Sequence, residues 1–99
     1  MTGANYRAMG VSYRGLYVFG VVEGLKASWV FTQAPVTLAF SNCVSGMSGE
    51  QERTIVDRYM ESHRQFWNLN ASALVLQSFR EICPDFAALF DVQGVKPAP

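Results

Sequence analysis

The residues of this 99-residue chain that could do chemistry are few: one histidine, His63, two cysteines, Cys43 and Cys83, and eight carboxylates. A cysteine beside a histidine can act as a nucleophile, and the same residue types bind zinc. Neither the spacing nor the number of ligands matches such a site, and the sequence contains no G-x-S-x-G nucleophile motif. We therefore expect a protein that is not an enzyme and that has no metal site and no cofactor.

The charged residues favour neither catalysis nor nucleic-acid binding. Glu50 and Glu52 lie two positions apart, so on a helix their side chains point in different directions and do not form an acid/base pair. They are better explained as acidic residues at the positive end of a helix. Eight Lys and Arg residues balance eight Asp and Glu residues, and no run of basic residues occurs. We expect no nucleic-acid partner, because such a partner requires a basic surface.

The best candidate for a partner-binding site is the segment His63, Arg64, Gln65, Phe66 and Trp67. Two adjacent large aromatic residues beside Arg and His are residue types that dominate hot spots at protein interfaces. The alternative is that Phe66 and Trp67 fold inward and cap a helical bundle. The residue types alone leave both interpretations open.

Two amphipathic helices are predicted to flank this segment. Ser48 followed by Gln51 has the spacing of a capping box and predicts the start of the first helix. Asn70 is the expected N-cap of the second helix, and Pro84 is expected to end it within a residue or two. The residues that follow the helical spacing in the second helix are Ala71, Leu74, Val75, Ser78, Phe79 and Ile82. The connection over residues 62–69 is short, so the helices are predicted to form an antiparallel hairpin.

The first long segment, residues 11–31, is apolar on nearly all sides and predicts a buried central helix. Gly20 and Gly24 lie one turn apart, where the absence of side chains would let a crossing helix pack closely. A strand is the alternative, because β-branched and aromatic residues are frequent here, but the length and the lack of alternation favour a helix. Charged residues and glycines within the segment argue against a transmembrane span, and we expect no membrane insertion.

The region after this segment is predicted to be a connection. Proline disfavours helical geometry in the residue before it, so Ala34 and Pro35 are expected to end the first helix. The residues up to Gly46 include Ser, Asn and Gly and are expected to form a loop, with room for one extra turn over residues 36–40.

The C-terminal part is predicted to complete a single domain over residues 1–99. A short closing helix is expected around residues 86–90. From about residue 92 the periodicity is lost, and a flexible tail is expected. The predicted fold class is all-α, a small helical bundle with an antiparallel hairpin closed by one disulfide.

The disulfide follows from the hairpin. If the two amphipathic helices fold back on each other, the start of the first and the end of the second meet, and Cys43 and Cys83 should then form a bond. The alternative is two unrelated buried thiols. Disulfides persist in oxidising compartments, so the bond would indicate the periplasm for a bacterial chain. No secretory signal is visible at the N-terminus, and removal of a leader is compatible with that.

Five segments follow one another in the order YVFGVVEG at residues 17–24, CVSGMSGEQ at 43–51, IVDRYMESH at 55–63, NASALV at 70–75 and FRE at 79–81. Together they resemble one protein family, the Rap/Tai immunity proteins of bacterial type VI secretion. The resemblance covers roughly residues 13–84. It implies a small, mostly helical periplasmic protein that usually forms a homodimer. It also implies an inhibitor that binds a secreted, peptidoglycan-degrading amidase and blocks its active site.

The sequence departs from the family pattern in three respects. The family histidine is commonly followed by Pro-Glu, whereas Arg64 and Gln65 follow His63 here. The last family cysteine usually follows Phe-Pro, whereas Cys83 precedes Pro84, and a second cysteine pair that is frequent in the family is absent. The working hypothesis is an amidase immunity protein that uses residues 63–67 as contacts. The alternative is a periplasmic helical binding or scaffold module with another partner.

Overall fold

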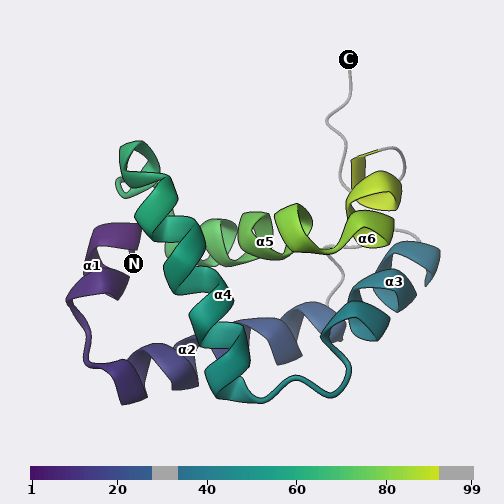
Figure 1. Cartoon of the computed structure of the whole chain (residues 1–99), viewed down its shortest axis with the longest axis horizontal. Coiled ribbons are helices and arrows are strands. Elements are labelled where there is room, and N and C mark those ends of the chain that lie inside the picture. The colour runs from purple at the N-terminus through teal and green to yellow at the C-terminus, as the bar shows by residue number, and fades with distance from the viewer. Residues whose placement is uncertain (28–33, 92–99) are drawn as a thin grey trace.

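A computed structural model of the whole chain is shown in Figure 1, and it describes residues 1–27 and 34–91. These residues form helices and one isolated β-bridge, between Thr2 and Asn70, with no strand among them. The elements are α1 (Gly3–Ala8), α2 (Val11–Lys26), α3 (Ala34–Val44), α4 (Gly49–Ser62), the 3-10 helix η1 (Arg64–Phe66), α5 (Ala71–Ile82) and α6 (Pro84–Leu89). The predicted all-α helical bundle is confirmed.

The predicted caps position α4 and α5. The Ser48 hydroxyl accepts a hydrogen bond from the Gln51 amide at 3.1 Å, and the Gln51 side chain accepts one from the Ser48 amide at 2.8 Å. Asn70 caps α5 by accepting from the Ser72 amide at 2.9 Å. α5 ends at Ile82, and Pro84 then occupies the first position of α6, where its missing N–H costs no helical hydrogen bond.

The core lies where the longer helices cross. Its fully buried side chains come from six helices and include Tyr6, Val18, Val22, Val36, Phe40, Val56, Met60, Val75, Phe79 and Phe86. The Phe40 ring contacts Phe79 and Phe86 edge to face, with centroids 5.9 and 5.1 Å apart. This geometry is favourable because the positive ring edge meets the negative ring face.

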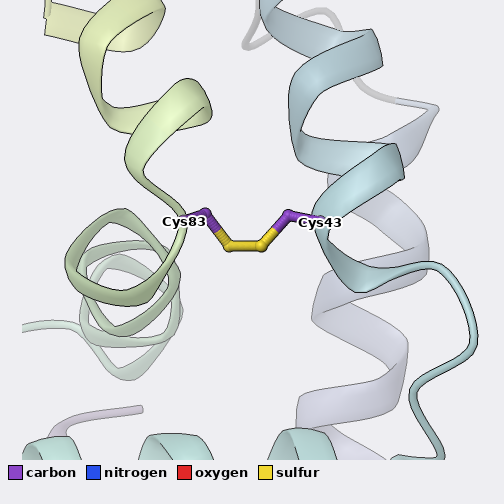
Figure 2. The surroundings of a disulfide bond; sticks show 2 residues. All are labelled: Cys43 and Cys83. Carbon is purple, nitrogen blue, oxygen red and sulfur yellow. A yellow bond between two sulfur atoms is a disulfide. The ribbon is translucent and has the colours of Figure 1, made fainter.

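A short turn joins α4 to α5, and the predicted disulfide is formed. Cys43 and Cys83 are bonded, with their Cα atoms 6.0 Å apart (Figure 2). Cys83 lies between α5 and α6, and Cys43 lies within the last turn of α3, just ahead of α4. Figure 1 shows α5 crossing α4, and Cys43 belongs to α3, the element before α4.

The structure corrects the prediction that residues 35–46 form a loop. α3 runs from Ala34 to Val44. Pro35 lies in its first turn, where proline is tolerated because the first N–H groups of a helix have no partner within it. Val36, Phe40 and Val44 are buried at a spacing of four residues, which is the signal of an amphipathic helix that the prediction overlooked.

The prediction of a buried central helix over residues 11–31 is also corrected. In α2 the buried residues are Val18 and Val22, whereas the Leu16 side chain is 69% exposed. A chain of this size has too few helices to surround one of them. Apart from the adjacent backbone of α2 itself, no heavy atom lies within 4 Å of a Cβ built on Gly20 or Gly24, so the expected close helix packing is not found there among the described residues.

Two expectations fall on residues that the structure does not describe. They are the continuation of the first helix to residue 31 and the flexible tail from about residue 92, and both lie outside residues 1–27 and 34–91. The predicted closing helix does lie within the described part. It is α6, which begins slightly earlier than expected, and it places Phe86 in the core.

Candidate partner-binding site

The turn between α4 and α5 begins with His63, which is held by its own helix. Its Nδ1 lies 2.7 Å from the carbonyl oxygen of Tyr59. A carbonyl only accepts, so Nδ1 carries the proton. The imidazole also stacks between the rings of Tyr59 and Phe66, with centroids 4.0 and 5.7 Å away, and its Nε2 is 3.8 Å from a Glu81 carboxylate oxygen. These contacts fix the ring at the edge of the turn.

Phe66 and Trp67 are directed inward and not away from the molecule. Phe66 is half-buried and packs against the core. The indole N–H of Trp67 donates to the carbonyl oxygen of Met60 at 2.8 Å. The structure therefore places both rings as the capping interpretation describes. Of the five candidate residues it leaves Arg64 and Gln65 exposed, with the Arg64 side chain 71% exposed.

Backbone hydrogen bonds also join the turn to α1, an element that the sequence pattern did not predict. The amides of Gly3 and Ala4 donate to the carbonyl oxygens of Leu69 and Trp67, both at 2.9 Å. The Ala71 amide donates to the Met1 carbonyl oxygen at 2.9 Å. The sequence does contain a local signal for α1, the capping box between Thr2 and Asn5. The helix that follows it has only six residues, so its hydrophobic pattern is too short to recognise.

A cluster of arginines lies beside the turn, around the polar face of α4. Asp57 is its centre. The Asp57 carboxylate accepts a hydrogen bond from Arg53 Nη1 at 2.7 Å and one from the Tyr6 hydroxyl at 2.9 Å. Arg7 Nη1 and Arg14 Nε each lie 3.5 Å from Oδ1 of the same carboxylate. Burial, the hydrogen bond to Asp57 and the negative charge of Asp57 raise the pKa of the Tyr6 phenol.

Glu61 connects this cluster with the turn. Its two carboxylate oxygens lie 3.2 Å from Arg7 Nη2 and 3.1 Å from Arg64 Nη2. The guanidinium groups of Arg7 and Arg64 also lie over the ring of Trp67, with 5.8 and 5.6 Å between the carbon of each group and the ring centroid. Cation–π contacts of this kind stabilise the positions of both partners. The exposed tip of the turn and the arginine cluster thus form one continuous surface.

Glu52 lies in the first turn of α4, at the positive helix end predicted for it. The residue is nevertheless 2% exposed, and its Oε1 is buried without a hydrogen-bond partner among the described residues. Burial, followed by the charge of Glu23, raises its pKa from 4.5 to about 7, while Lys26 acts in the opposite direction. Glu52 on α4 faces α2, because Glu23 and Lys26 both belong to α2.

The described residues hold neither a cluster of metal ligands nor a membrane-crossing helix. No three His, Cys, Asp or Glu side chains in ranges 1–27 and 34–91 are grouped so that they could bind a metal ion. Within the same ranges, no helix has the length and apolar character that crossing a bilayer requires. Both cysteines are bonded to each other.

Fold and site together define a small all-α domain braced by a disulfide. Such a bond fits a location outside the cytoplasm, where thiols are not kept reduced. Searches of protein-family models, curated proteins and solved structures found no match to this chain.

Proposed function

We propose that this chain is an immunity protein of bacterial type VI secretion, which binds a secreted cell-wall amidase in the periplasm and inhibits it. The resemblance of residues 13–84 to the Rap/Tai family supplies the class of partner. The observation that carries the proposal is the turn between α4 and α5, which is held from both sides and exposes Arg64 and Gln65.

A turn of this kind suits an inhibitor because it is already ordered before binding. Ordering a loop on association reduces affinity, and the contacts of Trp67 with Met60 and Ala4 remove that cost in advance. Arg64 and Gln65 offer hydrogen-bond donors at the tip, where they can reach polar groups in a groove. His63, Phe66 and Trp67 then support the tip from behind, with their half-buried rings contributing at its edge.

A homodimer is the second part of the proposal, and it follows from the same resemblance. α2 offers apolar surface that a second copy would cover, because its large side chains Tyr13, Leu16 and Phe19 are 69, 69 and 46% exposed. Sedimentation equilibrium of the purified protein tests this part. A single species with the mass of one chain at high micromolar concentration would refute it.

The alternative function is a periplasmic helical binding or scaffold module with another partner. The same turn would serve it equally well, since a fold does not define a function. The neighbouring genes discriminate between the two: an adjacent gene for a secreted amidase supports the immunity function.

The direct test is binding and inhibition of the amidases secreted by the same organism. We expect one of them to be captured by the oxidised protein and to lose its peptidoglycan hydrolysis in the complex. An Arg64→Ala, Gln65→Ala variant should lower the affinity at least about tenfold, as expected for loss of charged hydrogen bonds at an interface. Lys26→Gln, which removes a positive charge at the far end of α2, should bind as the wild type does.

The proposal fails if none of these amidases binds. It also fails in its choice of site if the Arg64→Ala, Gln65→Ala variant inhibits as strongly as the wild type. Circular dichroism of the variant verifies that the helices are intact, which is expected because both side chains are exposed.

A further inference from the structure

We propose that the surface between α1, α2 and α4 is a binding site for a carboxylate side chain of the protein partner. This surface is a cleft of about 560 Å³ that contains four arginines, Arg7, Arg14, Arg53 and Arg58, and we call it the arginine cleft. The inference depends on the proposed function only in taking the partner to be a protein. In Figure 1, α1, the beginning of α2 and α4 frame this side of the molecule.

The arginine cleft has more hydrogen-bond donors than acceptors. Each guanidinium carries five N–H groups. The two carboxylate oxygens of Asp57 are shared by three guanidinium groups, those of Arg7, Arg14 and Arg53. Those oxygens accept hydrogen bonds from Arg53 and Tyr6, whereas Arg7 and Arg14 reach them only at 3.5 Å. The Nε atoms of Arg7 and Arg14 are buried without a hydrogen-bond partner among the described residues.

Buried donors without acceptors destabilise a protein unless something else satisfies them. Arg14 does use one of its terminal nitrogens, which donates to the Met9 carbonyl oxygen at 2.6 Å. That bond and the contacts with Asp57 hold the guanidinium in place while its Nε has no hydrogen bond within the described part of the chain. An additional oxyanion is the group that such an arrangement lacks, because arginine recognises planar oxyanions through paired N–H groups.

The charge of the arginine cleft attracts an anion. Four guanidinium groups and the carboxylates of Asp57 and Glu61 line the cleft, which leaves two positive charges in excess on a chain with no net charge. This excess attracts any anion, so the choice of a carboxylate depends on geometry. Two or more arginines already share each resident carboxylate, so the local geometry suits that group.

The arginine cleft is continuous with the proposed docking turn. Arg7 contributes to both, since it contacts Asp57 within the cleft and, through Glu61, faces Arg64 of the turn. A partner that covers the turn would therefore bring an adjacent Asp or Glu side chain over the cleft. Such a contact would add an acceptor to a cleft that has an excess of donors, and the excess positive charge would attract it.

The test is a titration of the oxidised protein that is followed by NMR signals of the arginine Nε–Hε groups. Hexaglutamate is the probe, with hexaglutamine as its neutral counterpart and inorganic phosphate as a free anion. We expect hexaglutamate to shift the Arg7 and Arg14 signals saturably, and the other two compounds to leave them unchanged at the same concentrations.

Two variants with the same change of charge locate the effect. Arg58→Gln should weaken hexaglutamate binding about tenfold, the order expected for one charged hydrogen bond. Arg58 is exposed, so this change leaves the fold intact. Lys26→Gln lies outside the cleft and should change the affinity less than about twofold.

The outcomes separate this inference from the proposed function. Absence of a hexaglutamate response, an equal response to phosphate, or equal binding by the Arg58→Gln variant would overturn the carboxylate site. An amidase complex whose affinity does not change in Arg58→Gln would overturn its role at the interface. Failure of every amidase to bind, together with a saturable hexaglutamate response that Arg58→Gln weakens, would refute the immunity function and support the arginine cleft.

Discussion

The most unusual single residue in the structure is Glu52, a carboxylate in the core-facing surface of α4. The residue is 2% exposed, and one of its oxygens has no hydrogen-bond partner among the described residues. Transfer of a charge from water to such a site is unfavourable, so the group responds by holding its proton to higher pH. Its pKa is raised to about 7 by burial and by Glu23.

The raised pKa of Glu52 makes stability depend on pH. The folded-state pKa exceeds the unfolded value of 4.5, so the folded protein holds more protons between pH 4.5 and about 7. The contribution of Glu52 to the free energy of unfolding is then highest below pH 4.5 and falls as the pH rises towards 7. Glu52→Gln removes the charge and should raise the free energy of unfolding at pH 8 by about 1 to 3 kcal/mol.

Urea unfolding at about pH 5 and about pH 8, on either side of the folded-state pKa, measures this effect. The advantage of Glu52→Gln over the wild type should be larger at the higher pH. Glu50→Gln is the matched control, since Glu50 is exposed in the same helical turn and its loss should cost only a few tenths of a kcal/mol at either pH. Equal advantages of Glu52→Gln at both pH values would show that the Glu52 carboxylate does not titrate in this range.

At the scale of the elements, α1 determines whether the turn is rigid. Its first residue, Gly3, lies directly against the turn: a Cβ at this position would be 2.7 Å from Leu74 Cδ1 and 3.1 Å from Trp67 Cα. The Leu74 side chain can move, but the backbone of Trp67 is held by its hydrogen bond to Ala4. Only glycine permits this approach.

Gly3→Ala should therefore lower the free energy of unfolding by about 1 to 3 kcal/mol, as overpacking typically does. It should also speed amide hydrogen exchange in the α4–α5 turn. Gly20→Ala is the opposite case, because apart from the adjacent backbone of α2 nothing lies within 4 Å of its Cβ position among the described residues. That change should raise the free energy of unfolding by up to about 1 kcal/mol through helix propensity. If Gly20→Ala destabilised the protein as Gly3→Ala does, the loss of stability could not be assigned to crowding at Gly3.

The elements differ in how far the sequence predicts them, and the reason is the range of the interactions involved. The starts of α4 and α5 depend on Ser48 with Gln51 and on Asn70, which act within one turn and are legible locally. The prediction misses α3 because it takes Pro35 as the end of a helix, although Pro35 lies in the first turn of the next one. The burial of α2 is overestimated because apolar content does not tell how many neighbours cover a helix.

The candidate site was predictable only in its position along the chain. Residues 63–67 do lie in the turn that joins α4 and α5. The inward placement of Trp67 depends on Met60 and Ala4, and the arginine cluster joins the N-terminal helices to α4 through Asp57. Contacts between residues so far apart in the sequence arise from tertiary packing, which no local pattern encodes.

At the scale of the whole molecule, the disulfide joins α3 to the junction of α5 and α6 (Figure 2). Cys83 is fully buried there, and Cys43 is partly buried. The neighbouring aromatic contacts of Phe40 with Phe79 and Phe86 hold the same elements together without a covalent bond. Both kinds of contact matter in a domain this small, since it buries a lower fraction of its surface than a larger one.

Loss of the disulfide should lower stability more than Gly3→Ala does. The bond joins residues 40 positions apart, and the chain-entropy model gives about 4 kcal/mol for a loop of that length. We expect the urea midpoint to fall when the wild type is reduced. The Cys43→Ala, Cys83→Ala variant should unfold near the reduced midpoint and should not respond to reductant.

A thiol titration measures the state of the two cysteines directly, and it should find no free thiol in the native protein. Two titratable thiols, or equal urea midpoints for the oxidised and reduced wild type, would contradict the role of the bond. Free thiols would also remove the argument for a location outside the cytoplasm, because that argument depends on a disulfide that persists. The proposed partner is a secreted protein, so the proposed compartment and the proposed immunity function both rest on the presence of this bond.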